Sequence, residues 1–189
     1  LLFLGPTEVL LPFLVKNELH AGAGSLGFIL GAGGVGALAA AAIVGQRESF
    51  KRPVTFMYVA WGAATLLVAG YGIATQRWLL ALLALTINGF EAAGAVAWAT
   101  LKQHHVPRDM LGRVSSIDWF VSTSLMPLSY ALTPVAAALL GVRTTLVAAG
   151  LLGAAITIGF LFVPGMRQHD RPPAPAVPVN STNAAAVSA

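Results

Sequence analysis

Acidic residues within long apolar stretches are the first candidates for chemistry in this sequence. Glu91 is the one charged residue in the run 78–101, and Asp118 is the one charged residue in the run 114–142. A third acid, Glu8, lies in the apolar stretch that opens the chain. A carboxylate at membrane depth costs a few kcal/mol or more, so such residues are mostly functional. We therefore take these three acids as candidates for substrate binding or proton exchange.

Other polar and aromatic side chains fall on the same helical faces as these acids. In the run 114–141 the polar residues recur at spacings of three, four, seven and four, which places them on one face: Ser115, Asp118, Ser122, Ser129 and Thr133. Lipid cannot form hydrogen bonds with these polar side chains, so this face of the helix must lie against protein or water. Asn88 and Trp98 share a face with Glu91, and Tyr58, Trp61 and Thr65 form a similar stripe. Aromatic groups beside an acid are typical of a pocket for amphipathic or cationic molecules.

Structural roles for the same residues stay open at this point. Asp118 lies about one turn into its apolar run, where it would also serve as a helix cap or as the partner of Arg113. Glu91 would also serve as a structural ion-pair partner or as a buried protonated acid. The aromatic residues are compatible with ordinary packing, and Trp78 with a position at the membrane surface.

The composition indicates that these residues are positioned by membrane helices. Of 189 residues, 57% are hydrophobic and 10% are charged, and the mean hydropathy is +0.77. A soluble domain has roughly a quarter of its residues charged, so this chain cannot cover a water-facing surface. The net charge of +4 comes from residues in short loops, and no stretch interleaves basic with aromatic residues, which disfavours nucleic-acid binding. The absence of cysteine excludes disulfides and thiolate-bound metals.

The apolar runs predict an all-α membrane protein, a bundle of six transmembrane helices occupying residues 1–167. The expected spans are 1–15, 25–45, 54–75, 78–101, 114–141 and 144–165, the fifth of them broken by Pro127 and Pro134. A full span needs about 20 residues, so we expect the first to be the end of a truncated helix. Gly27 and Gly31 predict a close approach between helices. Residues 168–189, rich in proline and alanine, predict a disordered tail.

The distribution of basic residues predicts the orientation of the bundle. One set of connections carries eight basic residues: Arg47, Lys51, Arg52, Lys102, Arg108, Arg113, Arg167 and Arg171. The other set carries three, which are Lys16, Arg77 and Arg143. Cytoplasmic loops carry the excess of lysine and arginine. We therefore expect the C-terminus to be cytoplasmic in a multi-pass protein of the inner (plasma) membrane.

The remaining motifs do not indicate a cofactor, a metal site or an enzymatic activity. Residues 31–36 match the dinucleotide fingerprint G-x-G-x-x-G, but this motif requires a preceding strand and an acid about twenty residues later. Here the motif lies within a predicted span, where its glycines would allow close helix packing or make the helix narrower at a gate. His104, His105 and Asp109 lie in a basic loop without a second carboxylate, so we expect a solvated loop. No serine within a span has a histidine partner, which disfavours a membrane protease.

Three passages resemble the C-terminal half of a major facilitator superfamily transporter. Residues 5–12 (GPTEVLLP) resemble the seventh helix of the bacterial drug-efflux branch that includes macrolide and enterobactin exporters. Residues 103–116 (QHHVPRDMLGRVSS) resemble the loop between its helices ten and eleven. Residues 45–52 (GQRESFKR) stand where a Gly-x-x-x-Asp-Arg-x-Gly-Arg loop recurs in the superfamily. They keep the basic residues Arg47, Lys51 and Arg52 but lack the aspartate.

The resemblance implies one of two six-helix bundles, which rock against each other around a central site. It implies the missing N-terminal six-helix half, the lipid bilayer, protons and a small-molecule substrate as partners. In a proton-driven exporter of drug-like or siderophore-like amphipathic compounds, Glu91, Glu8 or Asp118 would exchange the proton. Two alternatives remain, a nutrient importer of the same fold and a non-transporting membrane scaffold.

Overall fold

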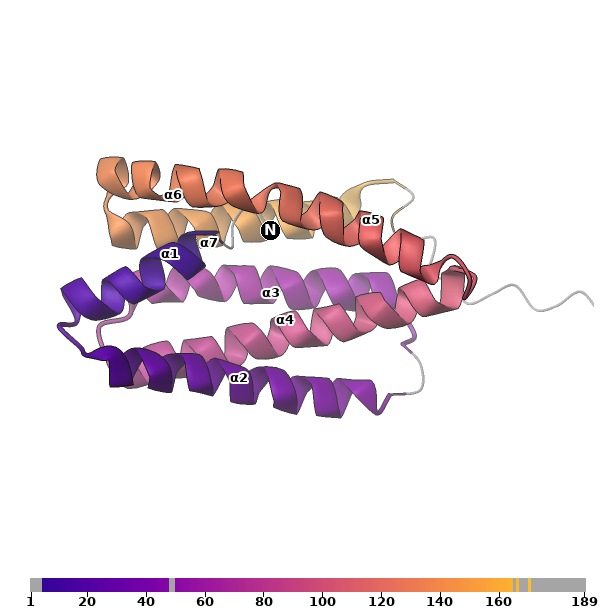
Figure 1. Ribbon diagram of the computed structural model, residues 1–189, viewed down its shortest axis with the longest axis horizontal. Coiled ribbons are helices and arrows are strands. Elements are labelled where there is room, and N and C mark those ends of the chain that lie inside the picture. Colours follow the sequence, from indigo (N-terminus) through magenta and orange to yellow (C-terminus); the bar gives the residue numbers. More distant parts are fainter. Residues whose placement is uncertain (1–4, 48–49, 165, 167–169, 171–189) are drawn as a thin grey trace, which may run out of the picture.

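The computed structural model describes residues 5–47, 50–164, 166 and 170, and every regular element in this part of the chain is helical. The elements are α1 (Gly5–Phe13), the π-helical η1 (Leu14–Glu18), α2 (Ala23–Gly45), α3 (Pro53–Ile73), α4 (Arg77–His105), α5 (Leu111–Ser124), α6 (Met126–Leu140), α7 (Val142–Gly159) and the 3-10 turn η2 (Phe160–Phe162). The elements α2 to α7 lie along one common direction, with α5 and α6 following one another (Figure 1).

Five helical segments are long and apolar enough to cross a membrane. They are α2, α3, α4, the α5–α6 segment (Leu111–Leu140) and the α7–η2 segment (Val142–Phe162). The first predicted span is represented by the nine-residue α1 and the five-residue η1, and residues 1–4 of it lie outside the described part. The prediction of an all-α membrane protein is confirmed. The chain is a multi-pass helical bundle.

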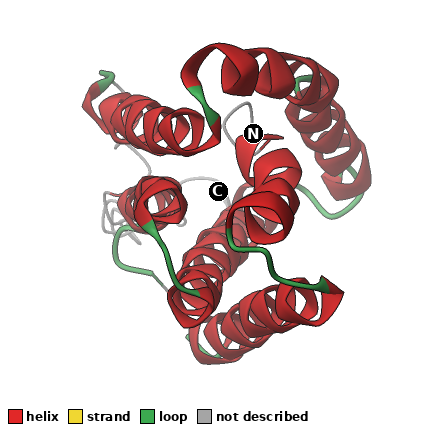
Figure 2. Ribbon diagram, turned by 90° about the vertical axis from the view of Figure 1, so that its left-hand side faces the viewer, coloured by secondary structure: helices red, strands yellow, loops and turns green. Residues whose placement is uncertain are grey.

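The connections alternate between the two ends of the bundle. The basic connections that follow α2 and α4 lie at one end, and the short turns after α3 and α6 lie at the other (Figure 1). We call the first of these the basic end and the second the arginine-poor end. In the view of Figure 2 the helices surround α1, whose start lies near the middle of the group.

The packing is that of a lipid-exposed bundle, with glycines at a close helix contact and many large apolar side chains on the outside. Closest packing joins α2 to α4 and α3 to α4 and α7. Where α2 meets α4, a Cβ on Gly33 would meet the Asn88 side chain, and one on Gly36 would meet the Leu85 backbone. Large side chains such as Leu38 and Phe120 are 74% exposed. Such exposure of large apolar side chains is typical of membrane helices.

The glycine pair predicted for a close helix approach was the wrong one. Gly27 and Gly31 have open space around them in the described chain, whereas Gly33 and Gly36 face α4. The fingerprint-like glycines of residues 31–36 lie within α2, and two of them serve helix packing. The physical reason is rotational, since residues 27, 31 and 34 share one face of the helix while 33 and 36 lie on another.

The fifth predicted span is interrupted once. Helix α5 ends at Ser124 and α6 begins at Met126, with the break at Leu125. Pro127 lies in the first turn of α6, where its missing N–H leaves no helical bond unmade. Pro134 lies inside α6 without ending the helix, so only the first proline coincides with a break.

Arg143 joins three elements at the arginine-poor end. Its Nε donates to Glu18 Oε2 at 2.5 Å, and its Nη1 donates to the carbonyls of Gly72 at 3.1 Å and Ala74 at 2.9 Å. Terminal helix carbonyls have no intrahelical partner, so this guanidinium supplies the missing donors at the end of α3. It thereby ties the end of η1 to α3 and α7.

At the basic end, Asp170 supplies a cap for α3. Its carboxylate accepts hydrogen bonds from the backbone N–H of Val54 at 2.9 Å and of Thr55 at 3.1 Å, and from the Thr55 hydroxyl. Arg52, at the N-cap position, makes no capping bond of its own. The other residues of the predicted disordered tail, 168–169 and 171–189, lie outside the described residues.

Candidate functional site

Glu91 lies midway along α4, half-buried and facing the region of α1 and α3. Its carboxylate interacts electrostatically with that of Glu8 on α1, and Glu8 itself is exposed. The Trp61 indole of α3 donates to the backbone carbonyl of Glu91 at 3.3 Å. A side chain at Gly94, one turn further along, would overlap the Trp61 ring. The glycine therefore lets the tryptophan lie against α4 beside the acid.

The carboxylate of Glu91 accepts no hydrogen bond and forms no ion pair within the described residues. An acid without such a partner is free to bind a cation or to take up and release a proton. This is the chemistry that a coupling residue needs, and it distinguishes Glu91 from Asp118.

Asp118 is engaged by two side chains of α4. Lys102 Nζ lies 2.8 Å from Asp118 Oδ2, and the Trp98 indole donates to the same oxygen at 3.0 Å. The Lys102 ammonium also lies 5.5 Å from the centre of the Trp98 ring, within the range of a cation–π contact. We call Trp98, Lys102 and Asp118 the α4–α5 clamp, because they join these two helices. The partner of Asp118 is thus Lys102 and not Arg113, which is exposed.

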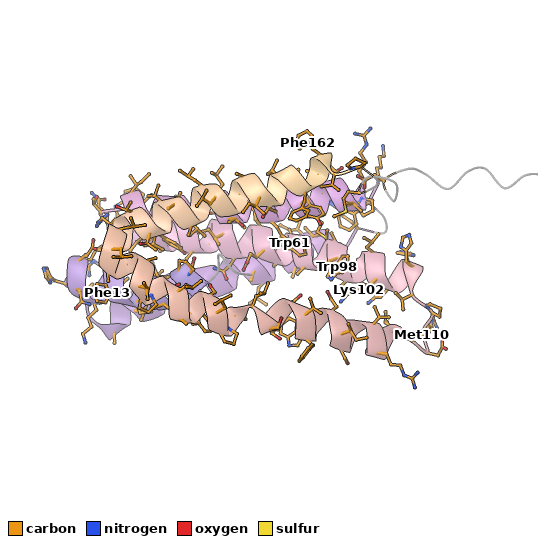
Figure 3. The ribbon with its side chains drawn as sticks, turned by 90° about the horizontal axis from the view of Figure 1, so that it is seen from above. Phe13, Trp61, Trp98, Lys102, Met110 and Phe162 are labelled. Atoms are coloured by element: carbon orange, nitrogen blue, oxygen red, sulfur yellow. The ribbon has the colours of Figure 1, made fainter. Side chains whose placement is uncertain are left out.

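The clamp lies toward the basic end of the bundle. Figure 3 shows Trp61, Trp98 and Lys102 following one another toward the end where Met110 lies, while Phe13 lies at the opposite end. Trp61 on α3, and Trp98 and Lys102 on α4, therefore follow one another from the middle of the bundle toward its basic end. Sequence reasoning missed Lys102, although its position one turn beyond Trp98 was a signal for it.

The polar stripe of the fifth span faces protein. Ser129 and Thr133 are each 2% exposed, and Ser115, Asp118 and Ser122 are half-buried. Residues on the other faces of the same span are open, including Trp119 and Phe120. Ser129 lies against Gly5 of α1, where a Cβ would overlap its hydroxyl. The stripe is therefore turned toward α1 and α4, away from the open side.

The remaining predicted site residues either pack within the bundle or are exposed. The Asn88 amide donates to the Ala84 carbonyl at 2.9 Å and lies against Gly33, so Asn88 belongs to the α2–α4 contact. Tyr58 is half-buried on α3. The four predicted loop residues, Arg47, Lys51, Arg52 and Arg113, are exposed at the basic end.

Comparison with known proteins and families identifies the family of this chain. No curated protein and no solved structure matches it. A family model described as "Transmembrane secretion effector", of the major facilitator type, matches residues 3–186, nearly the whole sequence. With its apolar helices and the two acids held between them, the chain belongs to the transmembrane secretion effector family of major facilitator transporters.

Proposed function

We propose that this chain forms the C-terminal half of a proton-coupled exporter of small amphipathic compounds, with Glu91 as the proton-exchanging residue. The observation that carries the proposal is the contrast between the two acids on α4 and α5. Glu91 has no hydrogen-bond or ion-pair partner in the described chain, while Asp118 is held by Lys102 and Trp98. An acid without such a partner among the described residues can change its protonation state without breaking an ion pair, and Glu91, unlike the exposed Glu8, lies half-buried within a span.

Outward transport is favoured by the description of the family as secretion effectors. The substrate class follows from the groups at Glu91, since the Trp61 ring beside it supplies aromatic surface to an apolar molecule and the carboxylate supplies a negative charge. Alternating access requires a second helical bundle, and we propose the N-terminal half of the same fold as that partner.

The orientation of the bundle follows from its charge asymmetry. Arg47, Lys51, Arg52 and Arg113 are exposed at the basic end, and the positive-inside rule places this end in the cytoplasm of the inner membrane. In that orientation the α4–α5 clamp lies on the cytoplasmic side of Glu91, and the turn carrying Arg143 lies on the outer side. Substrate then enters from the clamp side and leaves past Glu91.

The test is export of a fluorescent amphipathic cation, such as ethidium, from preloaded cells that express the full protein. We expect Glu91→Gln to lose at least nine-tenths of the export rate, on the order of a lost coupling step, while reaching the membrane in wild-type amounts. Asp109→Asn is the matched control, because Asp109 is an exposed carboxylate of the basic end. It should export as the wild type does.

A protonophore should stop export by the wild type, since the proton gradient drives it. If Glu91→Gln exports at the wild-type rate, the role assigned to Glu91 is wrong. If the wild type accumulates the cation instead of expelling it, the direction is wrong, and an importer of the same fold is the correct description.

A further inference from the structure

A cleft of about 910 Å³ opens at the arginine-poor end, away from Glu91 and the α4–α5 clamp. It lies where η1, the start of α2, the α3–α4 turn and the start of α7 meet. The residues of its wall that matter here are Glu18, Ser25, Phe28, Arg77, Trp78 and Arg143. Neither the packing of the bundle nor the proposed proton exchange uses this cleft.

The charge that the cleft offers to a ligand is positive. Arg143 is committed to Glu18 and to two backbone carbonyls. Arg77 is exposed, has no acidic partner in the described chain, and makes one hydrogen bond of 3.3 Å to the Ser25 hydroxyl. A guanidinium has five N–H donors, so most of those of Arg77 are left for a ligand.

The surrounding backbone does not compensate this charge. The starts of α2, α4 and α7 contribute to the wall through Ser25, Arg77 and Arg143. None of these three helices has an acidic residue in its first turn or a side-chain cap. Helix starts carry partial positive charge, and here they add to the field of Arg77. An anionic group is therefore the favoured occupant.

Two large aromatic side chains give the cleft an apolar side. Phe28 is 64% exposed and Trp78 is 62% exposed, and both line the cleft next to the cationic groups. Tryptophan at the end of a membrane helix lies at the level of the lipid head groups. A ligand with an anionic head and an apolar body would satisfy both sides of the cleft at once, whereas a free inorganic anion would leave the aromatic rings unused.

We propose that this cleft binds the anionic head group of an amphipathic molecule, with Arg77 contacting the anion and with Phe28 and Trp78 contacting the apolar part. A phosphate-bearing lipid of the adjoining leaflet and a soluble single-chain amphiphile share this chemistry. The cleft contains none of the residues to which proton exchange is assigned.

The experiment is native mass spectrometry of the detergent-purified full protein, titrated separately with phosphatidylglycerol, dodecyl phosphate and inorganic phosphate. We expect Arg77→Gln to weaken binding of both amphiphiles about tenfold, the effect of one charge-assisted hydrogen bond. The matched control is Arg108→Gln, which removes an exposed arginine at the opposite end of the bundle. It should bind as the wild type does. The melting temperature of each variant in detergent reports whether it is folded.

A second variant, Trp78→Ala, should weaken binding of both amphiphiles while leaving that of inorganic phosphate unchanged. Tighter binding of phosphatidylglycerol than of dodecyl phosphate identifies a lipid site, and the reverse order identifies a site for a soluble amphiphile; either supports the proposal. Equal binding by folded Arg77→Gln and Arg108→Gln overturns it. So does a wild-type protein that binds inorganic phosphate as tightly as the amphiphiles.

Discussion

The contact between α2 and α4 fixes the position of the helix that carries Glu91, and Gly36 is the residue that sets its closeness. A Cβ built on Gly36 lies 2.7 Å from the Leu85 carbonyl carbon and 2.9 Å from the Leu85 Cα, and closer still to the carbonyl oxygen. These atoms are backbone, so no rotamer change relieves the overlap. Since ordinary contacts begin at about 3.5 Å and the carbonyl oxygen is the nearest atom, Gly36→Ala must separate the two helices locally by about 1 Å or more.

A separation of this size forfeits a quarter to a half of the dispersion energy of the affected contacts, and overpacking of a close-packed interior costs about 1–3 kcal/mol. The higher helix propensity of alanine returns up to about 1 kcal/mol. We therefore expect a net loss of about 1–2 kcal/mol, which corresponds to a fall of roughly 2–8 °C in melting temperature for a chain of this size.

The assay is thermal unfolding of the detergent-purified protein, followed by size-exclusion chromatography after heating to graded temperatures. The control is Gly34→Ala, two residues earlier in the same helix, where nothing lies within 4 Å of the added Cβ. It should melt at or slightly above the wild-type temperature. A Gly36→Ala protein that melts no lower than Gly34→Ala would refute the packing of α2 on α4 described here.

Two further predictions concern the ends of the helices. At the α4–α5 clamp, Lys102→Met and Asp118→Asn should each reduce ethidium export several-fold, because removing one partner leaves the other charge uncompensated. The double variant should lose less export activity than the sum of the two single losses. Additive losses in this double-mutant cycle would contradict the pairing. At the basic end, Asp170→Ala should lower the free energy of unfolding by about 1 kcal/mol through loss of the α3 cap, which is measured as a lower melting temperature. Asp109→Asn is the control, and an unchanged melting temperature of Asp170→Ala would contradict the cap.

Export assays of Glu91→Gln and lipid binding by Arg77→Gln address different parts of the molecule. The first concerns the middle of the bundle, and the second concerns the arginine-poor end. Loss of lipid binding with full export would leave the transport proposal intact, and loss of export with full lipid binding would leave the cleft intact.

Hydropathy and charge placement were enough to predict the class of the fold. The absence of charge over long runs determines membrane helices, because backbone polar groups in lipid must be satisfied within the helix. The spacing of Ser129 and Thr133 likewise predicted their common face, since 3.6 residues complete a turn. Such features depend only on residues close together in the chain, so the sequence contains them directly.

Which faces meet was decided by the tertiary structure. The spacing of Gly27 and Gly31 predicted a close helix contact, but the rotation of α2 against α4 brings Gly33 and Gly36 to that contact instead. Asp118 had an arginine five residues away, yet its partner is Lys102 on the neighbouring helix. The cap that Asp170 gives to α3 joins residues more than a hundred positions apart. The sequence determined that these are membrane helices with few acids. The packing of α5 on α4 decided that Asp118 is paired with Lys102, whereas Glu91 has no such partner among the described residues. Such contacts between helices are not specified by local spacing.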